Sequence, residues 1–292
     1  FLAGSALTAG LVGLAGCSSN GAAGTSTADP LAAPAADKYP IDPDKEGTEA
    51  KWSSEEIRDG WTRVTNPDGG AAIGVADTAR IIQVDGYAFR DMDGDGKLSL
   101  FEDWRQSADD RAADLASQLT GEECIQLMWH GGVQGVADKP GSKVDANDTS
   151  LLDKGSCAGV SRLGGDGDSY ATVIKWINDI QTKCEARPHG IPYICSVDPY
   201  ATLGIPSSVG LAPAMDKVLW RKAGMWIGRA WSSIGVRCEL GPQIDLYTDP
   251  TVTRLNGAET EDPALARDFT RAFAGGMQST WGDDEATDDK GW

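Results

Sequence analysis

Basic side chains are scarce in this sequence of 292 residues. Lys and Arg together number 26 against 44 Asp and Glu, which gives a formal net charge of −18. Binding to a phosphate backbone needs a basic face, and a surface this acidic would repel a polyanion. The composition therefore argues against nucleic acid as a partner. Hydrophobic residues still make up 40% of the chain, which is enough for a sizeable core.

Histidine is also rare, and no C-x-x-C motif occurs. The two histidines are His130 and His189, and the six cysteines are widely spaced. Structural zinc sites draw four ligands from clusters of His and Cys, so a zinc site has little support here. Cys157 and Cys184 bracket a predicted helix and form one candidate disulfide. Buried, inert thiols are the alternative for most of the cysteines.

The sequence contains no apolar run of the length that crosses a membrane. Residues 1–16 are uncharged and apolar, which is typical of the hydrophobic region of an export signal, but a spanning helix needs about 20 such residues. This run ends in Leu14-Ala15-Gly16-Cys17, which resembles the lipobox of bacterial lipoproteins. We expect export, with Cys17 lipidated at the outer face of a bacterial cell membrane, or secretion. The alternative is an apolar helix that happens to precede a cysteine.

Residues 91–102 match the calcium-loop pattern D-x-[DN]-x-[DN]-G-x₅-E at every defined position. Alternate oxygen ligands converge on a hard cation, and Gly96 permits the sharp turn. The expected ligands are Asp91, Asp93, Asp95, Lys97 through its carbonyl, Ser99 through water, and Glu102. Residues 84–90 look like a strand rather than an entering helix. A single such loop indicates structural calcium rather than a sensor. A solvated acidic turn without metal is the alternative.

Helical and strand-like patterns alternate along the second half of the chain. Thr120 and Glu123 have the spacing of a capping box. Helices are expected over residues 108–118, 122–129, 170–187, 216–234 and 263–278, and strands over 191–198 and 236–246. Upstream, residues 38–84 are polar and mixed, which predicts an extended, loop-rich arm. Residues 131–167 are rich in Gly, Asp and Ser, which predicts loops with one short strand.

Strand, helix, strand and helix in alternation indicate an α/β fold with a parallel sheet. Asp198 and the segment 245–254 follow the two predicted strands, where barrel enzymes place their chemistry. A closed eight-stranded barrel usually needs about 250 residues, more than residues 108–292 provide. A barrel would therefore need further strands downstream.

Several separated blocks resemble the family 3 glycoside hydrolases, the β-glucosidase, exo-glucanase and β-xylosidase type of enzyme. They are GYAFRDMDGDGKLSLFEDWR from Tyr87, RAADLASQLTGEE from Arg111, IPYICSVDP from Ile191, GIPSSVGLAPAMD from Gly204, GVRCELGPQIDLYTDP from Gly235 and ETEDPALARDF from Glu259. The resemblance implies an incomplete (β/α)₈ TIM-type barrel, truncated at the C-terminus and preceded by the EF-hand-like calcium loop. It also implies a retaining reaction with one carboxylate as nucleophile and a second as acid.

The resemblance assigns two substrate-binding residues and no catalytic residue. Asp198 matches the strand-end Asp that accepts hydrogen bonds from sugar hydroxyls, and Arg254 matches an Arg that donates to them. The alternatives are a strand-end cap for Asp198 and a surface ion pair for Arg254. The family's catalytic carboxylates are expected downstream of Trp292. Pro199-Tyr200 replaces a His-Gly pair, so the sugar subtype stays open.

We expect four segments: an export signal with lipobox (1–17), a flexible tether (18–37), an N-terminal arm with the calcium loop (38–107) and a partial barrel (108–292). Together they predict the N-terminal part of an exported glycosidase that hydrolyses terminal β-linked sugars of oligosaccharides or β-glycosides. The chain alone is expected to be inactive, with calcium as its structural cofactor and the membrane contacted only through the lipid. The alternative is a noncatalytic, calcium-dependent carbohydrate-binding surface lipoprotein. A calcium-regulated interaction protein has less support, because no second loop occurs.

Overall fold

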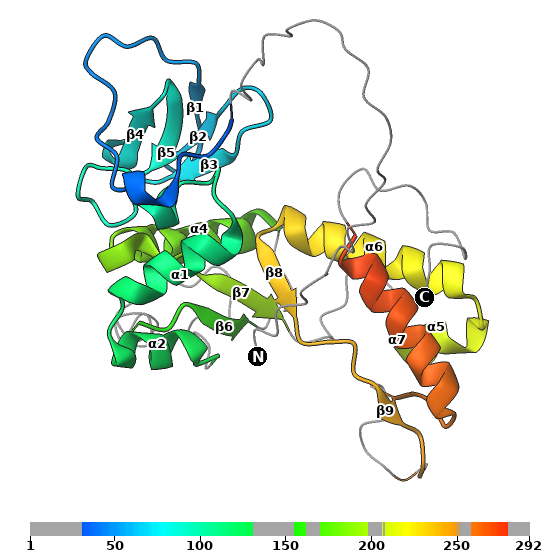
Figure 1. The fold of residues 1–292 in the computed structure, drawn as a ribbon. Helices are drawn as coiled ribbons and strands as arrows, with labels where there is room; N and C mark the ends of the chain where they lie inside the picture. The colour runs from blue at the N-terminus through cyan, green and yellow to red at the C-terminus, as the bar shows by residue number, and fades with distance from the viewer. Residues whose placement is uncertain are drawn as a thin grey trace, which may run out of the picture.

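The computed structural model describes residues 31–130, 155–161, 170–197, 206, 208–249, 251 and 258–279. Figure 1 shows an all-β region at the upper left, a parallel sheet with adjoining helices below that region, and a pair of helices at the right. Within the described residues, no helix combines the length and apolarity needed to cross a membrane.

The all-β region consists of a three-stranded antiparallel sheet and a hairpin. The sheet contains β1 (Ser53–Arg58), β2 (Trp61–Thr65) and β3 (Ala72–Val75), and the hairpin contains β4 (Ile81–Val84) and β5 (Tyr87–Arg90). The loop-rich arm expected over residues 38–84 is therefore wrong for residues 53–84, whereas residues 31–52, called the arm below, contain no named strand.

The strand β1 was missed because every one of its residues is exposed, so its sequence has no alternation of apolar and polar residues. The turns carry the signal instead, because Asp59-Gly60 and Asp85-Gly86 both adopt positive φ. Asp-Gly with two positive φ angles is the sequence favoured in a tight hairpin turn, since its backbone twist matches that of the flanking strands.

The hairpin has its own apolar core, which also takes in residues from the arm. The buried residues are Ile82, Val84, Tyr87, Phe89 and Leu98, with Leu31, Tyr39, Ile41 and Trp104 packed against them. The rings of Phe89 and Trp104 stack with centroids 5.2 Å apart. The segment before the first strand is therefore part of this core.

Two predicted helices follow and are confirmed. They are α1 (Ala108–Gln118) and α2 (Gly121–Met128). Thr120 and Glu123 form both hydrogen bonds of the predicted capping box, from the Glu123 N–H to Thr120 Oγ1 and from the Thr120 N–H to Glu123 Oε2. This reciprocal cap satisfies two backbone donors and determines where α2 begins.

A parallel sheet occupies the centre of the chain. Its strands β6 (Ala158–Ser161), β7 (Ile194–Val197) and β8 (Val236–Glu239) lie in the order β6-β7-β8. Helices α4 (Tyr170–Glu185) and α6 (Lys217–Ser233) form the crossovers. The predicted α/β class with a parallel sheet is confirmed. The single short strand expected within 131–167 is β6, and most of that range lies outside the described residues.

The core of the sheet lies between β7 and two helices. Residues of α4, β7, β8 and the end of α6 form one cluster, comprising Val173, Trp176, Ile177, Ile180, Cys184, Tyr193, Cys195, Val197, Trp231, Ile234 and Val236. The last three residues of β7 are all buried, as a strand covered on both faces requires. The near-continuous apolar sequence of this strand is thereby explained.

The second predicted strand, over residues 236–246, is wrong as one element. β8 ends at Glu239, and β9 (Asp245–Leu246) pairs instead with β10 (Ala258–Thr260) in parallel. Gly241-Pro242 lies between them. Proline has no backbone N–H to give to a sheet ladder, so it ends the strand. Strands β6 to β10 thus form a three-stranded parallel sheet and a separate pair.

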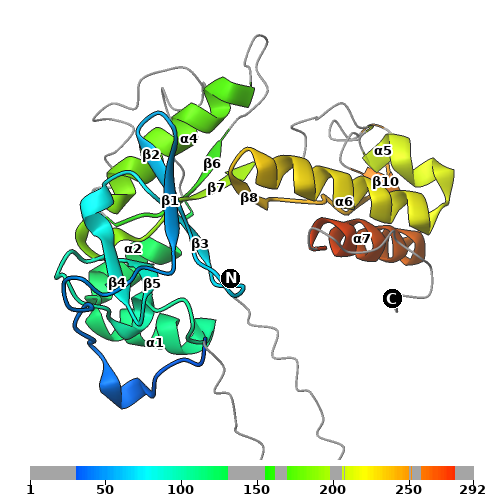
Figure 2. The same ribbon diagram turned by 90° about the horizontal axis from the view of Figure 1, so that it is seen from above.

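Helices α6 and α7 (Pro263–Met277) cross at very close range, side by side in Figure 2. A Cβ atom on Gly224 would lie 2.1 Å from the Phe273 carbonyl oxygen, and one on Gly276 would lie 2.1 Å from that of Arg221. Around this crossing pack Trp220, Phe269 and Phe273, reached by Leu211 of α5 (Ser208–Leu211). Glycine is required here because the two backbones touch.

The candidate disulfide between Cys157 and Cys184 is wrong in this structure, since both thiols are free and buried. Arg187 Nη1 lies 3.8 Å from the Cys157 sulfur. Burial is the first cause that raises the pKa of both thiols, that of Cys184 to about 12. A thiol held this strongly protonated is a poor nucleophile. The alternative of buried, inert thiols fits this pair.

We expect Gly224→Ala to destabilise the protein by about 1–3 kcal/mol, because the added methyl group forces α6 away from α7. Chemical denaturation followed by tryptophan fluorescence measures the loss. Gly121→Ala is the matched control, since the first residue of α2 has open space around its Cβ position. Equal unfolding free energies for the two variants would contradict the close crossing.

Candidate functional site

The structure describes some of the predicted site residues and not others. All six predicted calcium ligands lie in described segments. Cys17, Asp198 and Arg254 lie outside the described residues, so their predicted roles stay predictions. The described residues therefore include the acidic loop and the strands of the parallel sheet.

Three of the predicted ligands are brought together at the start of the acidic loop. Carboxylate oxygens of Asp91, Asp93 and Asp95 lie within 4.8 Å of one another. Asp91 accepts hydrogen bonds from the N–H groups of Gly94 and Gly96 through different oxygens, at 2.7 and 3.1 Å. These bonds curl the backbone around the carboxylates, and the positive φ of Gly96, 78°, permits the turn.

Glu102 closes the loop from its far end, inside the 3₁₀ helix η3 (Leu100–Glu102). Its carboxylate accepts from the N–H of Met92 at 2.6 Å through one oxygen and from the N–H of Ser99 at 2.9 Å through the other. The side chain is only 3% exposed. Burial raises its pKa to about 8, despite these hydrogen bonds. A buried carboxylate of this kind is stabilised in its charged form by a nearby cation.

The remaining expected ligands are Lys97 and Ser99, in the second half of the loop. Lys97 pairs its ammonium group with Asp42 at 3.0 Å, and its expected ligand atom is the backbone carbonyl oxygen. Ser99 donates its backbone N–H to Glu102 at 2.9 Å. Oxygen ligands from carboxylates, one carbonyl and water suit Ca²⁺. The donor set of this loop therefore fits a hard cation of that kind.

The flank of the loop departs from the helix-loop-helix arrangement, as the sequence predicted. β5 leads into Asp91, and its Arg90 is the last strand residue. The sequence analysis missed one neighbour of the loop, Ile41. Its N–H and C=O both bond to Leu98, at 2.9 Å each, in an isolated antiparallel bridge. No sequence signal marks Ile41, because the bridge uses only backbone atoms.

The carboxyl-end region of the parallel sheet has one polar contact that the sequence did not reveal. The Ser196 hydroxyl on β7 donates to the Gly159 carbonyl at 2.7 Å. The Nε2 atom of His130 lies 2.6 Å from the Ser196 hydroxyl oxygen. Because the hydroxyl hydrogen is used by Gly159, His130 Nε2 is the donor to Ser196. His130 is exposed, and it ties the end of α2 to the buried centre of the sheet.

Strands β9 and β10 carry two further carboxylates. Glu259 is 7% exposed, and neither of its carboxylate oxygens has a hydrogen-bond partner among the described residues. Burial, and then the charge of Asp245, raise the pKa of Glu259 to about 8. Glu259 and Asp245 lie in sequence blocks to which the resemblance gives a structural role, so neither is assigned as nucleophile or acid.

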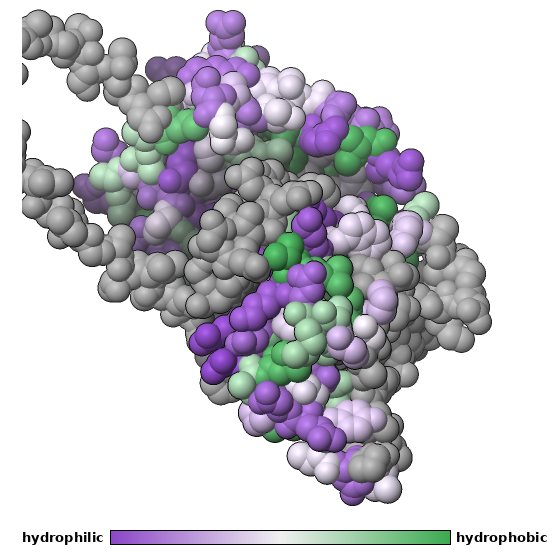
Figure 3. All heavy atoms as spheres, turned by 90° about the vertical axis from the view of Figure 1, so that its right-hand side faces the viewer, coloured by the Kyte–Doolittle hydropathy of each residue, from purple (hydrophilic) through white to green (hydrophobic). Residues whose placement is uncertain are grey.

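An apolar hollow of about 460 Å³ lies beside the same strands. Figure 3 shows this side of the molecule, where hydrophobic residues alternate with hydrophilic ones. The hollow is lined by Ile244, Leu246, Pro263, Ala266, Arg267, Thr270 and Arg271. The polar residues that line it in the described part of the chain, Arg267, Thr270 and Arg271, are not buried.

Comparison with known proteins gives a family. Residues 119–287 match the model of the glycosyl hydrolase family 3 N-terminal domain. A periplasmic beta-glucosidase/beta-xylosidase of Dickeya chrysanthemi is 34% identical over 219 residues, which cover 69% of this chain and 33% of that protein. A probable beta-glucosidase C of Aspergillus flavus is 26% identical over 200 residues, covering 63% and 32%. The chain thus spans about a third of the length of these relatives.

Solved structures also match, at a lower level. A glycosyl hydrolase of the same family from Mycobacterium smegmatis has a TM-score of 0.41 and 18% identity, covering 55% of this chain and 47% of that one. A TM-score of this size carries no argument about fold or function.

We expect the stability of the protein to fall as the pH rises from about 4.5 to about 8, in part because of Glu259. A carboxyl whose pKa is raised on folding holds its proton more tightly in the folded state, so its stabilisation is full at low pH and is lost as the pH passes the folded pKa. Glu259→Gln should therefore leave stability near pH 5 unchanged and raise it at pH 9 by roughly 2 kcal/mol. Urea denaturation at both pH values measures this. Glu261→Gln, an exposed neighbour, is the control, and an equal effect on the two variants would contradict the burial argument.

Proposed function

The chain belongs to glycosyl hydrolase family 3 through its N-terminal domain, and we propose that it is the N-terminal part of an exported retaining glycosidase that hydrolyses terminal β-linked sugars. The observation that carries the proposal is the family match over residues 119–287, which contains the whole parallel sheet and helices α4, α6 and α7. The names of its relatives support a β-glucoside or β-xyloside as the substrate class.

Substrate binding is proposed at the carboxyl end of β7. Asp198 directly follows Val197, the last residue of that strand, and a carboxylate there accepts hydrogen bonds from sugar hydroxyls. Arg254 is proposed to donate to the same sugar. The carboxyl ends of parallel strands are where α/β enzymes bind their ligands, because the loops that follow the strands meet there.

The chemistry itself is proposed to come from the remainder of a longer protein. In a retaining glycosidase, one carboxylate attacks the anomeric carbon and displaces the leaving group, which a second carboxyl group protonates; water then releases the sugar. We propose that this chain supplies sugar-binding residues and that both catalytic carboxylates come from a downstream segment. The (β/α)₈ barrel is likewise proposed, with β6, β7 and β8 as consecutive strands.

Export and anchoring are proposed from the first segment of the sequence. The lipobox-like run before Cys17 is the basis for a lipid anchor, followed by a tether over residues 18–37. The periplasmic name of the Dickeya relative supports export.

A structural calcium ion is proposed in the loop 91–102. Support comes from three converging Asp carboxylates and from the buried Glu102, which accepts hydrogen bonds from the N–H groups of Met92 and Ser99. A cation would supply the positive charge that this buried carboxylate otherwise lacks, and it would hold β5 against η3.

A noncatalytic, calcium-dependent carbohydrate-binding surface lipoprotein is the second candidate. It would be favoured if the family's catalytic carboxylates lie outside this chain, as the resemblance predicts. The two candidates share the calcium loop and Asp198, so only a measurement of hydrolysis distinguishes them.

We expect nitrophenol release from aryl β-glucosides or β-xylosides by a chain extended to the length of its relatives, and none by the 292 residues alone. In the extended chain, Asp198→Asn should lower kcat/KM by roughly tenfold to a hundredfold, because it loses a charged hydrogen-bond acceptor. Asp179→Asn, an exposed change on α4, is the control. A folded, extended chain with no activity would favour the noncatalytic candidate.

We expect the protein to bind one Ca²⁺ ion, measured by calorimetric titration, and to gain thermal stability from it. Glu102→Gln should weaken the affinity at least tenfold, since it removes a charged, bidentate ligand. Glu49→Gln removes the same charge from an exposed site and should leave the affinity nearly unchanged. Equal affinities for the two variants would show that any binding occurs elsewhere.

A further inference from the structure

The arm that precedes the first strand is bonded directly to the proposed calcium loop. Ile41 and Leu98 exchange two backbone hydrogen bonds, and Leu98 is fully buried. Leu98 is also the residue that follows Lys97, whose carbonyl is a proposed calcium ligand. Lys97 and Leu98 are consecutive, so the Lys97 C=O and the Leu98 N–H belong to one peptide group.

This peptide group links the proposed cation in the loop to the arm, because its two ends have a fixed relative orientation. A trans peptide is planar, so the Lys97 C=O and the Leu98 N–H point in opposite directions. When the carbonyl is turned to a cation in the loop, the N–H is turned outward to the Ile41 carbonyl. Polarisation of the carbonyl by a cation also strengthens the N–H as a donor, because hydrogen-bonded peptides polarise one another.

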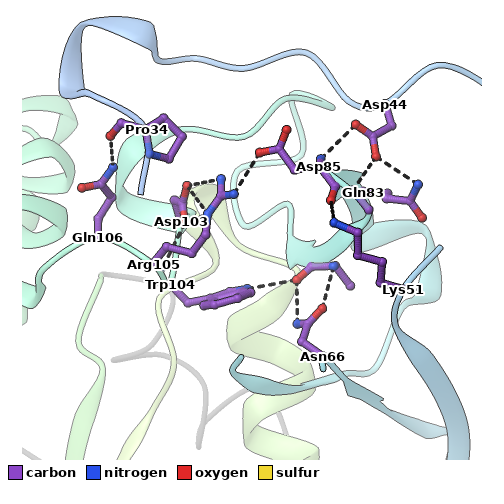
Figure 4. Close-up of polar contacts among 12 residues, drawn as sticks. Pro34, Asp44, Lys51, Asn66, Gln83, Asp85, Asp103, Trp104, Arg105 and Gln106 are labelled. Carbon is purple, nitrogen blue, oxygen red and sulfur yellow. Dashed lines mark hydrogen bonds and ion pairs between the residues drawn. The ribbon is translucent and has the colours of Figure 1, made fainter. Parts of the chain in front are cut away.

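Additional contacts hold the arm at the same place. Asp42 pairs with the Lys97 ammonium group at 3.0 Å, although both side chains are exposed and the pair by itself contributes little. The Tyr39 hydroxyl donates to Asp103 at 2.5 Å, directly after η3. Gln106 donates to the Pro34 carbonyl, as Figure 4 shows. The arm therefore contacts the middle of the loop and the segment that follows its end.

Asp44 fixes the arm to the hairpin. Its two oxygens accept from the N–H groups of Asp85 and Gly86 in the turn and from the Gln83 amide, at 2.8–3.0 Å (Figure 4). These bonds do not involve the cation loop. The docking at Asp44 is therefore expected to persist without a cation, whereas the bridge at Ile41 depends on the orientation of the Lys97–Leu98 peptide.

We propose that residues 36–42 of the arm are a calcium-dependent clasp, docked on the calcium loop through the Ile41–Leu98 bridge. Occupancy of the loop and docking of the clasp are coupled. The inference rests on the calcium site of the proposed function. Coupling between two binding events is reciprocal, so the docked clasp also raises the affinity for Ca²⁺.

Hydrogen exchange of the full chain tests the coupling without any mutation. We expect exchange at the Ile41 and Leu98 amides to slow at least tenfold when Ca²⁺ is added to metal-free protein, whereas the Asp85 and Gly86 amides, bonded to Asp44, change little. Mg²⁺ alone should have a much smaller effect. Bound Ca²⁺ with unchanged exchange at Ile41 would overturn the clasp and leave the calcium site standing. No Ca²⁺ binding by calorimetry would overturn both.

A pair of matched variants tests the reverse direction. Ile41→Ser removes the apolar side chain of the clasp and leaves every proposed ligand in place, so we expect a fivefold or larger loss of Ca²⁺ affinity. Ile57→Ser makes the same change at an exposed position of β1, which is 51% exposed, and should have no effect. Equal affinities for both variants, with circular dichroism showing that both are folded, would overturn the coupling.

Discussion

A buried ion pair between Asp103 and Arg105 is the interaction on which the whole N-terminal region depends. Both side chains are almost fully buried, and the guanidinium makes hydrogen bonds of 2.7–3.1 Å to the carboxylate. Arg105 also reaches Asp85 in the hairpin turn (Figure 4), and Asp103 also accepts a hydrogen bond from the Tyr39 hydroxyl of the arm. Removal of one partner from such a pair costs about 3–5 kcal/mol, because a charge is left buried alone. The arm, the hairpin and the segment that follows the acidic loop are therefore joined through the Asp103–Arg105 pair.

The same region is joined to the parallel sheet by a second buried carboxylate. Glu185 at the end of α4 accepts from the N–H groups of Ala76 and Asp77 at 2.8–3.0 Å, directly after β3. Nearby, Gly190 packs so closely on the loop that a Cβ there would lie 2.6 Å from the Met92 carbonyl. Gly190 ends the short turn that leads into β7. The acidic loop thus rests on the segment before the central strand.

Features with a local cause could be predicted from the sequence. The capping box of Thr120 and Glu123, the N-cap of α6 at Asp216 and the Pro at the first position of α7 all act within one helical turn. The apolar run of β7 is equally local in origin. The convergence of Asp91, Asp93 and Asp95 follows from a twelve-residue pattern, and the structure brings these three together.

Features that depend on a distant partner could not be predicted. The contact of His130 with Ser196 joins residues 66 positions apart, and that of Ile41 with Leu98 uses only backbone atoms. Cys157 and Cys184 bracket a helix, which suggested a disulfide, yet spacing along the chain does not determine whether two sulfur atoms are bonded.

The position of β7 explains why the proposed sugar-binding residue belongs at its end. β7 is the central strand of the three, bonded to β6 on one side and to β8 on the other. Its last three residues are buried, with Ser196 also held through its side chain. A binding group needs a support that does not move, and strands provide this better than loops do. Asp198 directly follows Val197, so it is joined to the central strand of the described sheet.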